Sequence, residues 1–124
     1  MNKFIIFVIG CTGCGKTALS IELAKAFAGE VINADSMQVY KSLPIATASP
    51  SSSERGDIPH HLFNFLDLDD EPYDVFKYLD DSLRVIGEVR ERGNVPIVVG
   101  GTHYYLLSLL FKGFFPFQPF RNRS

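Results

Sequence analysis

Apolar residues occur along this chain in two patterns, as short strand-like runs and at helical spacing, and the two patterns alternate. Residues 4–9 and 95–99 form continuous apolar runs. Because these runs lack polar alternation, they predict strands buried on both faces of a parallel sheet. Residues 30–34 predict a shorter strand. Strands separated by helices indicate an α/β fold with a parallel sheet.

The stretches between the strands predict helices. Leu19, Leu23 and Phe27 recur at helical spacing, and Ala18, Ile21 and Ala24 widen this apolar stripe. The pattern predicts a helix that ends near Ala28, with Gly29 as its stop. A longer helix is predicted from its N-cap, Asp74, to its stop at Gly93. Its expected buried face is Phe76, Leu79, Leu83 and Ile86, and its expected surface pairs are Asp80/Arg84 and Glu88/Arg92. A third helix is predicted to open at His103.

The segment between the first strand and the first helix fits the motif G-x-x-x-x-G-K-[ST]. Its glycines let backbone N–H groups converge on an anion, and the helix N-terminus adds a partial positive charge. We expect it to bind a di- or triphosphate, with Lys16 on phosphate oxygens and the Thr17 hydroxyl on Mg²⁺. The predicted binding residues are Gly10, Thr12, Gly13, Cys14, Gly15, Lys16 and Thr17.

Two further polar segments follow predicted strands, at the sheet edge where the phosphate loop is expected. Asp35 follows residues 30–34, and Gly100-Gly101-Thr102 follows residues 95–99. Ligands of open α/β sheets bind at the carboxyl ends of the strands, so Asp35 should face whatever Lys16 holds. On local grounds, Asp35 could equally be a Mg²⁺-side carboxylate or the N-cap of a helix over residues 36–40. The Gly-Gly-Thr segment could approach an anion closely or form a tight strand-to-helix turn.

Two other residue pairs allow alternative interpretations. Cys11 and Cys14 form C-x-x-C, which can be a redox dithiol, although a disulfide there would compete with phosphate binding. The simpler interpretation is two small loop residues. His60 and His61 could bind a metal, but sequence neighbours point in different directions, which favours a structural or substrate-loop role.

Composition limits the function classes. The chain has 124 residues, 46% hydrophobic and 21% charged, as expected of one globular domain at most. The formal net charge of −2 gives no general attraction to nucleic acid, so RNA contacts must be local or supplied by parts not present. Because no apolar run approaches the ~18 residues of a membrane span and a strand begins near Met1, we expect a cytoplasmic protein without a leader or membrane segment.

Four sequence motifs, in a fixed order along the chain, carry a family resemblance. They are residues 10–17, Asn33-Ala34-Asp35-Ser36-Met37-Gln38-Val39-Tyr40, Ile58-Pro59-His60-His61, and Val98-Val99-Gly100-Gly101-Thr102-His103-Tyr104-Tyr105. In this order they resemble the tRNA dimethylallyltransferases, also called tRNA isopentenyltransferases, and most closely their eukaryotic branch. The resemblance spans about residues 4 to 113. It implies a P-loop NTPase-like sheet flanked by helices, which is the N-terminal part of such an enzyme and incomplete relative to the family.

The resemblance implies a prenyl transfer. Dimethylallyl diphosphate would be the donor, and N6 of the adenosine 3′-adjacent to the tRNA anticodon the acceptor. Asp35 would take the proton of the attacking amine, while Lys16, Thr102 and Thr17 with Mg²⁺ stabilise the leaving diphosphate. Asp35, Ser36, Met37 and Gln38 would lie beside the target nucleotide. A cytoplasmic monomer is expected, with mitochondrial or nuclear pools possible.

Departures from the family pattern keep other functions open. Ser49 stands where the family usually carries a lysine, and the family's anticodon-gripping helical domain is absent. Residues 1–113 are expected to form the prenyltransferase core, whereas residues 114–124 form an atypical Phe- and Pro-rich tail. The alternatives are an adenylate isopentenyltransferase, a P-loop small-molecule kinase with Arg55 as its isolated lid arginine, and a truncated non-catalytic diphosphate-binding protein.

Overall fold

The computed structural model describes residues 4–10, 15–41, 52–67, 69–70 and 72–110. The predictions for Thr12, Gly13, the two cysteines, Ser49 and the tail at 114–124 lie outside these residues. The elements in chain order are β1 (Ile6–Ile9), α1 (Lys16–Phe27), β2 (Gly29–Asn33), α2 (Ser52–Arg55), β3 (His60–His61), α3 (Val75–Glu91), β4 (Val95–Gly100) and α4 (His103–Ser108).

The strands form one four-stranded parallel sheet in the order β1-β4-β2-β3. The α/β prediction is therefore confirmed, and β2 and β4 are buried along their whole length. The expectation that the first strand is buried on both faces is wrong within the described residues. There β1 is an edge strand, paired with β4, and Ile9 at its end is 57% exposed.

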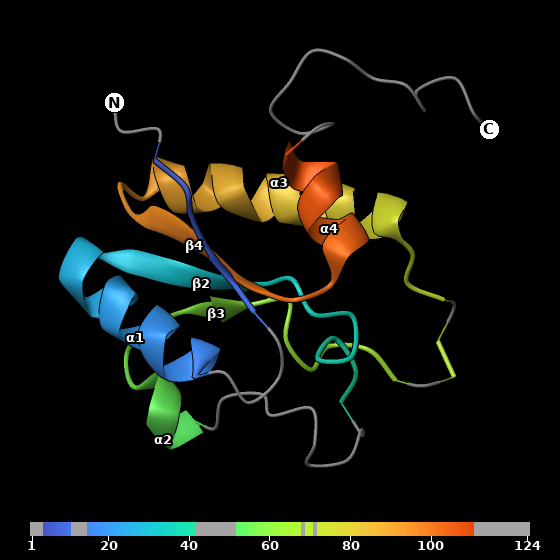
Figure 1. The fold of residues 1–124 in the computed structure, drawn as a ribbon, viewed down its shortest axis with the longest axis horizontal. Coiled ribbons are helices and arrows are strands. Elements are labelled where there is room, and N and C mark those ends of the chain that lie inside the picture. The colour runs from blue at the N-terminus through green and yellow to red at the C-terminus, as the bar shows by residue number, and fades with distance from the viewer. Residues whose placement is uncertain (1–3, 11–14, 42–51, 68, 71, 111–124) are drawn as a thin grey trace.

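Helices cover both faces of the sheet, with α3 and α4 on one side and α1 on the other (Figure 1). Alternate residues of the strands pack into two hydrophobic cores, one on each face of the sheet. Ile32 and Val98 pack with α3 and α4, whereas Val31 and Ile97 pack on the α1 side. This period of two, in strands that are apolar throughout, is what a sheet sandwiched between helices requires.

The predicted buried face of α1 is confirmed for Ile21 and Ala24 and wrong for Leu19 and Phe27. Leu19 and Phe27 are about half exposed, while Ser20, Ile21 and Ala24 are buried. The buried face therefore combines one large apolar residue, Ile21, with the small Ser20 and Ala24. The helix stop also differs, because Ala28 adopts the left-handed conformation (φ 54°) and Gly29 already belongs to β2.

The longer helix, α3, follows its predicted bounds. The Asp74 carboxylate accepts a hydrogen bond from the Lys77 N–H at 2.9 Å, which confirms the N-cap, and Gly93 is left-handed (φ 81°) just after the helix. Its buried face is wrong in part, because Phe76 is 49% exposed. The residues that are buried are Tyr78, Ser82, Val85, Ile86 and Val89.

The predicted surface pairs of α3 are also replaced. Arg84 pairs with Asp81 at 3.6 Å and with Glu88 at 3.4 Å. Arg92 instead binds Glu30 on β2 through two hydrogen bonds of 2.8 and 2.7 Å, and such two-bond arginine–carboxylate pairs are among the stronger ones. None of the helices in the described part of the chain combines the length and apolar content needed to cross a membrane.

Candidate functional site

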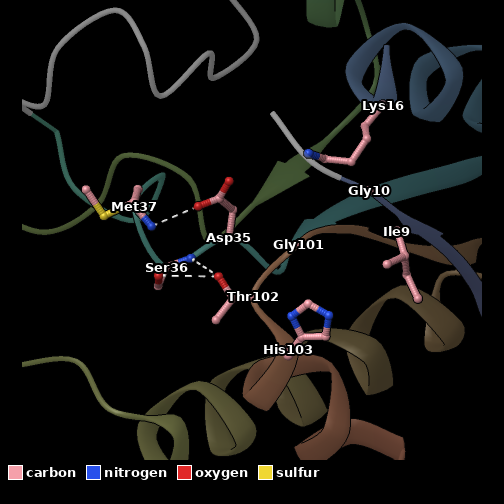
Figure 2. A pocket seen from close by; sticks show the side chains of 9 residues that line it. All are labelled: Ile9, Gly10, Lys16, Asp35, Ser36, Met37, Gly101, Thr102 and His103. Carbon is pink, nitrogen blue, oxygen red and sulfur yellow. Dashed lines mark hydrogen bonds between the residues drawn. The ribbon is translucent and has the colours of Figure 1, made fainter. Parts of the chain in front are cut away.

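A cavity of about 470 Å³ opens at the carboxyl ends of the strands. Residues from the ends of β1, β2 and β4 and from the starts of α1 and α4 surround it (Figure 2). Its described lining is Ile9, Gly10, Lys16, Asp35, Ser36, Met37, Gly101, Thr102 and His103. The prediction that the phosphate-loop segment, Asp35 and the Gly-Gly-Thr segment meet at one edge of the sheet is confirmed for the described residues Gly10, Lys16, Asp35, Gly101 and Thr102.

Lys16 and Asp35 reach this cavity from different elements. Lys16 is the first residue of α1, where Gly15 in the left-handed conformation (φ 79°) turns the chain into the helix. Figure 2 shows the Lys16 amine and the Asp35 carboxylate extending toward the same space from two sides. No ion pair joins the two among the described residues, so a ligand between them can use both the cation and the carboxylate.

The Asp35 side chain organises the turn that follows it. Its Oδ1 accepts a hydrogen bond from the Met37 N–H at 2.9 Å, and its carbonyl accepts one from the Gln38 N–H at 3.1 Å. Residues 36–39 form turns and not a helix, so the helix-cap interpretation of Asp35 is wrong. No hydrogen bond of the described residues uses the second carboxylate oxygen, Oδ2, which leaves it available as a base.

The Asn33 side chain holds the start of this turn, although Asn33 was not predicted as a site residue. It is fully buried at the end of β2, and its side chain binds both the N–H and the carbonyl of Asp35 at 2.8 and 2.9 Å. The signal that could have found it is a polar residue placed directly after the apolar Val31-Ile32 within a predicted strand. Buried polar side chains of this kind normally hold specific partners.

Thr102 joins the two strand ends that flank the cavity. Its Oγ1 accepts a hydrogen bond from the Ser36 N–H at 2.8 Å, and its own N–H donates to the Ala34 carbonyl at 3.1 Å. A Cβ on Gly100 would lie 2.3 Å from the Ala34 backbone, and one on Gly101 would lie 2.5 Å from the Gly10 carbonyl oxygen. The two glycines therefore allow close strand-end packing, which supports the tight-turn interpretation of this segment.

The other predicted site residues divide into three groups. Ser36 and Met37 line the cavity with Asp35, but Gln38 is 9% exposed and does not line it. Gly15 and Thr17 flank Lys16 without lining the cavity, and Thr12, Gly13 and Cys14 lie outside the described residues. Ile9 and His103 line the cavity and were not predicted as site residues; each directly adjoins a residue that was, Gly10 and Thr102.

The two histidines have structural partners. They form β3, a strand that the sequence did not predict, and His61 Nε2 lies 2.7 Å from Glu30 Oε1. Burial lowers the pKa of His60. No group of three or more His, Cys, Asp or Glu residues that could hold a metal occurs in the described part of the chain, so the metal interpretation of this pair finds no support.

Glu30 gathers a polar network near the opposite end of β2 from Asp35. Its carboxylate accepts bonds from Arg92 Nε at 2.8 Å and Nη2 at 2.7 Å, and from Asn94 Nδ2 at 2.7 Å. These bonds, led by that of Arg92, lower the Glu30 pKa to about 2. A paired, fully bonded carboxylate away from the cavity indicates a structural role.

Comparisons with known proteins identify the family. The family described as "IPP transferase" matches residues 38–123, and the one described as "Isopentenyl transferase" matches residues 2–59. The chain belongs to the IPP transferase family. The tRNA dimethylallyltransferase of Saccharomyces cerevisiae is 49% identical over 112 residues, covering 90% of this chain and 26% of the yeast protein. That of Desulfotalea psychrophila is 48% identical over 115 residues, covering 93% of this chain and 36% of the relative.

Solved structures agree with this IPP transferase assignment. A eukaryotic dimethylallyltransferase acting on tRNA has a TM-score of 0.82 at 49% identity, covering 87% of this chain and 27% of its own. The tRNA isopentenylpyrophosphate transferase of Bacillus halodurans has a TM-score of 0.84 at 37% identity, covering 97% and 39%. The present chain thus spans about a quarter to two fifths of the proteins it resembles.

Proposed function

We propose that the intact protein containing this chain is a tRNA dimethylallyltransferase. It transfers the dimethylallyl group of dimethylallyl diphosphate to N6 of the adenosine 3′-adjacent to the tRNA anticodon. The observation that carries the proposal is the cavity shared by Lys16 and Asp35, in a chain of the IPP transferase family. The family assignment disfavours the small-molecule kinase alternative.

The anionic end of the donor belongs beside Lys16. A diphosphate that leaves with its bonding electrons gains negative charge, and a cation held at the start of a helix stabilises that charge in the transition state. Thr102 is already fixed at the cavity edge by its bonds to Ser36 and Ala34. Its hydroxyl is therefore held in a defined place and would donate to a ligand oxygen in place of Ser36 Oγ, its acceptor at 3.3 Å.

The acceptor amine belongs beside Asp35. An exocyclic amine of adenine is a weak nucleophile, so its attack on the prenyl carbon is assisted when a carboxylate accepts the proton. Asp35 Oδ1 is held by the Met37 N–H, while Oδ2 has no described partner. The carboxylate is thus oriented at one oxygen and free to take a proton at the other.

Mg²⁺ fits the donors that this chain offers. Magnesium prefers oxygen ligands and is commonly held through substrate phosphates together with one or two protein groups. Thr17 follows Lys16 at the start of α1 and, although it does not line the cavity, it would supply one hydroxyl beside the phosphate oxygens of the donor. When bound, the ion would neutralise charge on the leaving diphosphate.

A second candidate acceptor is a free adenine nucleotide. It is favoured by the "Isopentenyl transferase" match to residues 2–59, which include the phosphate loop and Asp35. The donor and the roles of Lys16 and Asp35 would be unchanged. Competition between AMP and an anticodon stem-loop for a limiting amount of labelled donor separates the two acceptors.

The deciding experiment measures transfer and donor binding separately in the intact protein. We expect Asp35→Asn to lower transfer to an anticodon stem-loop by about 10²–10⁴-fold, the usual contribution of a general base, while donor affinity stays within twofold. Glu22→Gln on the exposed surface of α1 is the matched carboxylate control. Unchanged transfer by Asp35→Asn would contradict the assigned base. Transfer absent from the unaltered protein would support the non-catalytic alternative.

A further inference from the structure

Asn33 is a fully buried polar residue at the carboxyl end of β2. Its sequence neighbours Ile32 and Ala34 belong to the core under α3 and α4, so by the alternation of a strand the Asn33 side chain faces the opposite side. A carboxamide in such a place is stable only when its donors and acceptor are bonded. Its three hydrogen bonds therefore define what this side chain does.

Two of these bonds hold Asp35. Asn33 Oδ1 accepts from the Asp35 N–H at 2.8 Å, and Nδ2 donates to the Asp35 carbonyl at 2.9 Å. One side chain thus binds both backbone polar groups of the same residue. With its N–H and carbonyl fixed, Asp35 has a fixed Cα–Cβ direction, and that direction aims the carboxylate into the cavity (Figure 2).

The third bond connects this arrangement to β3. Nδ2 also donates to the Leu62 carbonyl at 3.0 Å, immediately after His60–His61. Leu62 is left-handed (φ 68°), a conformation that is unfavourable for a bulky residue and persists only where neighbouring contacts impose it. Asn33 is one of those contacts, so it joins the turn after β3 to the residue that faces the ligand.

We propose that Asn33 is a positioning residue for Asp35, which it holds at the geometry needed to accept the amine proton. This inference rests on the proposed function of Asp35 as the base. Asparagine suits the task because it supplies one acceptor and two donors in a plane. Alanine supplies neither, and an ionised aspartate keeps the acceptor but turns a second oxygen toward two carbonyl oxygens.

The test measures kcat and KM of the intact protein with dimethylallyl diphosphate and an anticodon stem-loop. Asn33→Ala is expected to lower kcat at least tenfold and to leave the donor KM within twofold, because Lys16 lies on a different element. Ile32→Val is the control, since it perturbs the same buried strand without touching a bond to Asp35. Thermal unfolding checks that each variant is folded at the assay temperature. A kcat within twofold of the unaltered protein overturns the proposal.

An isosteric variant decides the matter if Asn33→Ala does not fold. In Asn33→Asp the protonated side chain regains one donor, so its kcat relative to the unaltered protein should rise as pH falls from 8 to 6, roughly the range over which such a buried carboxyl takes up its proton. A ratio near one at every pH overturns the proposal.

Asp35→Asn, assayed in parallel, separates the hypothesis that Asp35 is the base from the hypothesis that Asn33 positions it. If it keeps full activity, the assigned base is wrong. If it is inactive while both Asn33 variants are normal, only the positioning role is wrong.

Discussion

Ser36 and Thr102 are 66 residues apart in the sequence and are joined by a hydrogen bond of 2.8 Å between the Ser36 N–H and Thr102 Oγ1. The Thr102 hydroxyl also lies 3.3 Å from Ser36 Oγ. The residue that follows Asp35 is thereby tied to the segment after β4. Thr102 consequently shapes the cavity before any ligand binds.

This hydrogen bond predicts that Thr102→Val lowers the stability of the fold. Valine keeps the size of the side chain and removes its hydroxyl. The Ser36 N–H then loses its partner in a half-buried place, so we expect the free energy of unfolding to fall by about 1 kcal/mol. Urea unfolding measures the change. Thr102→Ser retains the hydroxyl and is the matched control. Equal stability of the valine and serine variants would show that water replaces the bond without cost.

We expect Lys16→Ala to lower the affinity of the protein for inorganic pyrophosphate. Removing one charge-assisted contact of about 1.5–3 kcal/mol should raise the Kd for inorganic pyrophosphate by about 10–100-fold. Isothermal titration calorimetry on the intact protein gives this value. Lys25→Ala, in the exposed last turn of the same helix, removes an equal charge away from the cavity and should change the Kd by less than twofold. Unchanged affinity in the Lys16 variant would remove the basis of the phosphate-loop assignment.

Those parts of the fold that depend on local pattern could be predicted from the sequence. Apolar runs identified β1 and β4, and Asp74 and Gly93 marked the limits of α3. Parallel strands end at one edge of the sheet, so the meeting of Lys16 with Asp35 followed from their positions alone. These inferences need only the spacing of the apolar residues and the order of the segments along the chain.

Features set by distant contacts could not be predicted. The strand β3 has two residues and no apolar run, and it exists because β2 offers it a pairing edge. Hydropathy favoured Leu19 as a buried residue of α1, but it is 51% exposed, and the side that faces the sheet carries Ile21 and Ala24. Arg92 binds Glu30, 62 residues earlier, and not the nearby Glu88. In each case tertiary packing outweighed a local preference.

Gly100→Ala and Gly87→Ala are expected to change stability in opposite directions. A Cβ at position 100 meets the Ala34 backbone at 2.3 Å, and the strands can accept it only by separating, at a cost of about 1–3 kcal/mol or more. At position 87, on the exposed side of α3, nothing lies within 4 Å. Alanine there should stabilise the helix by about 0.5–1 kcal/mol. Midpoints of urea unfolding give both signs, and a neutral Gly100→Ala would show that β2 and β4 separate easily at this end.

The Glu30 network predicts a stability that falls in acid. The bonds from Arg92, Asn94 and His61 lower the Glu30 pKa from 4.5 to about 2. A carboxyl whose pKa is lower in the folded state stabilises the fold above its unfolded pKa, and this stabilisation is lost as pH falls from about 4.5 toward about 2. Glu30→Gln should therefore be less stable than the unaltered protein at pH 7, because the paired charge is gone, and the difference should shrink through this acid range. Urea unfolding at pH 7, 4 and 3 measures it, with the exposed Glu22→Gln as control. A difference that stays constant across these pH values would mean that Glu30 is not held ionised by its partners.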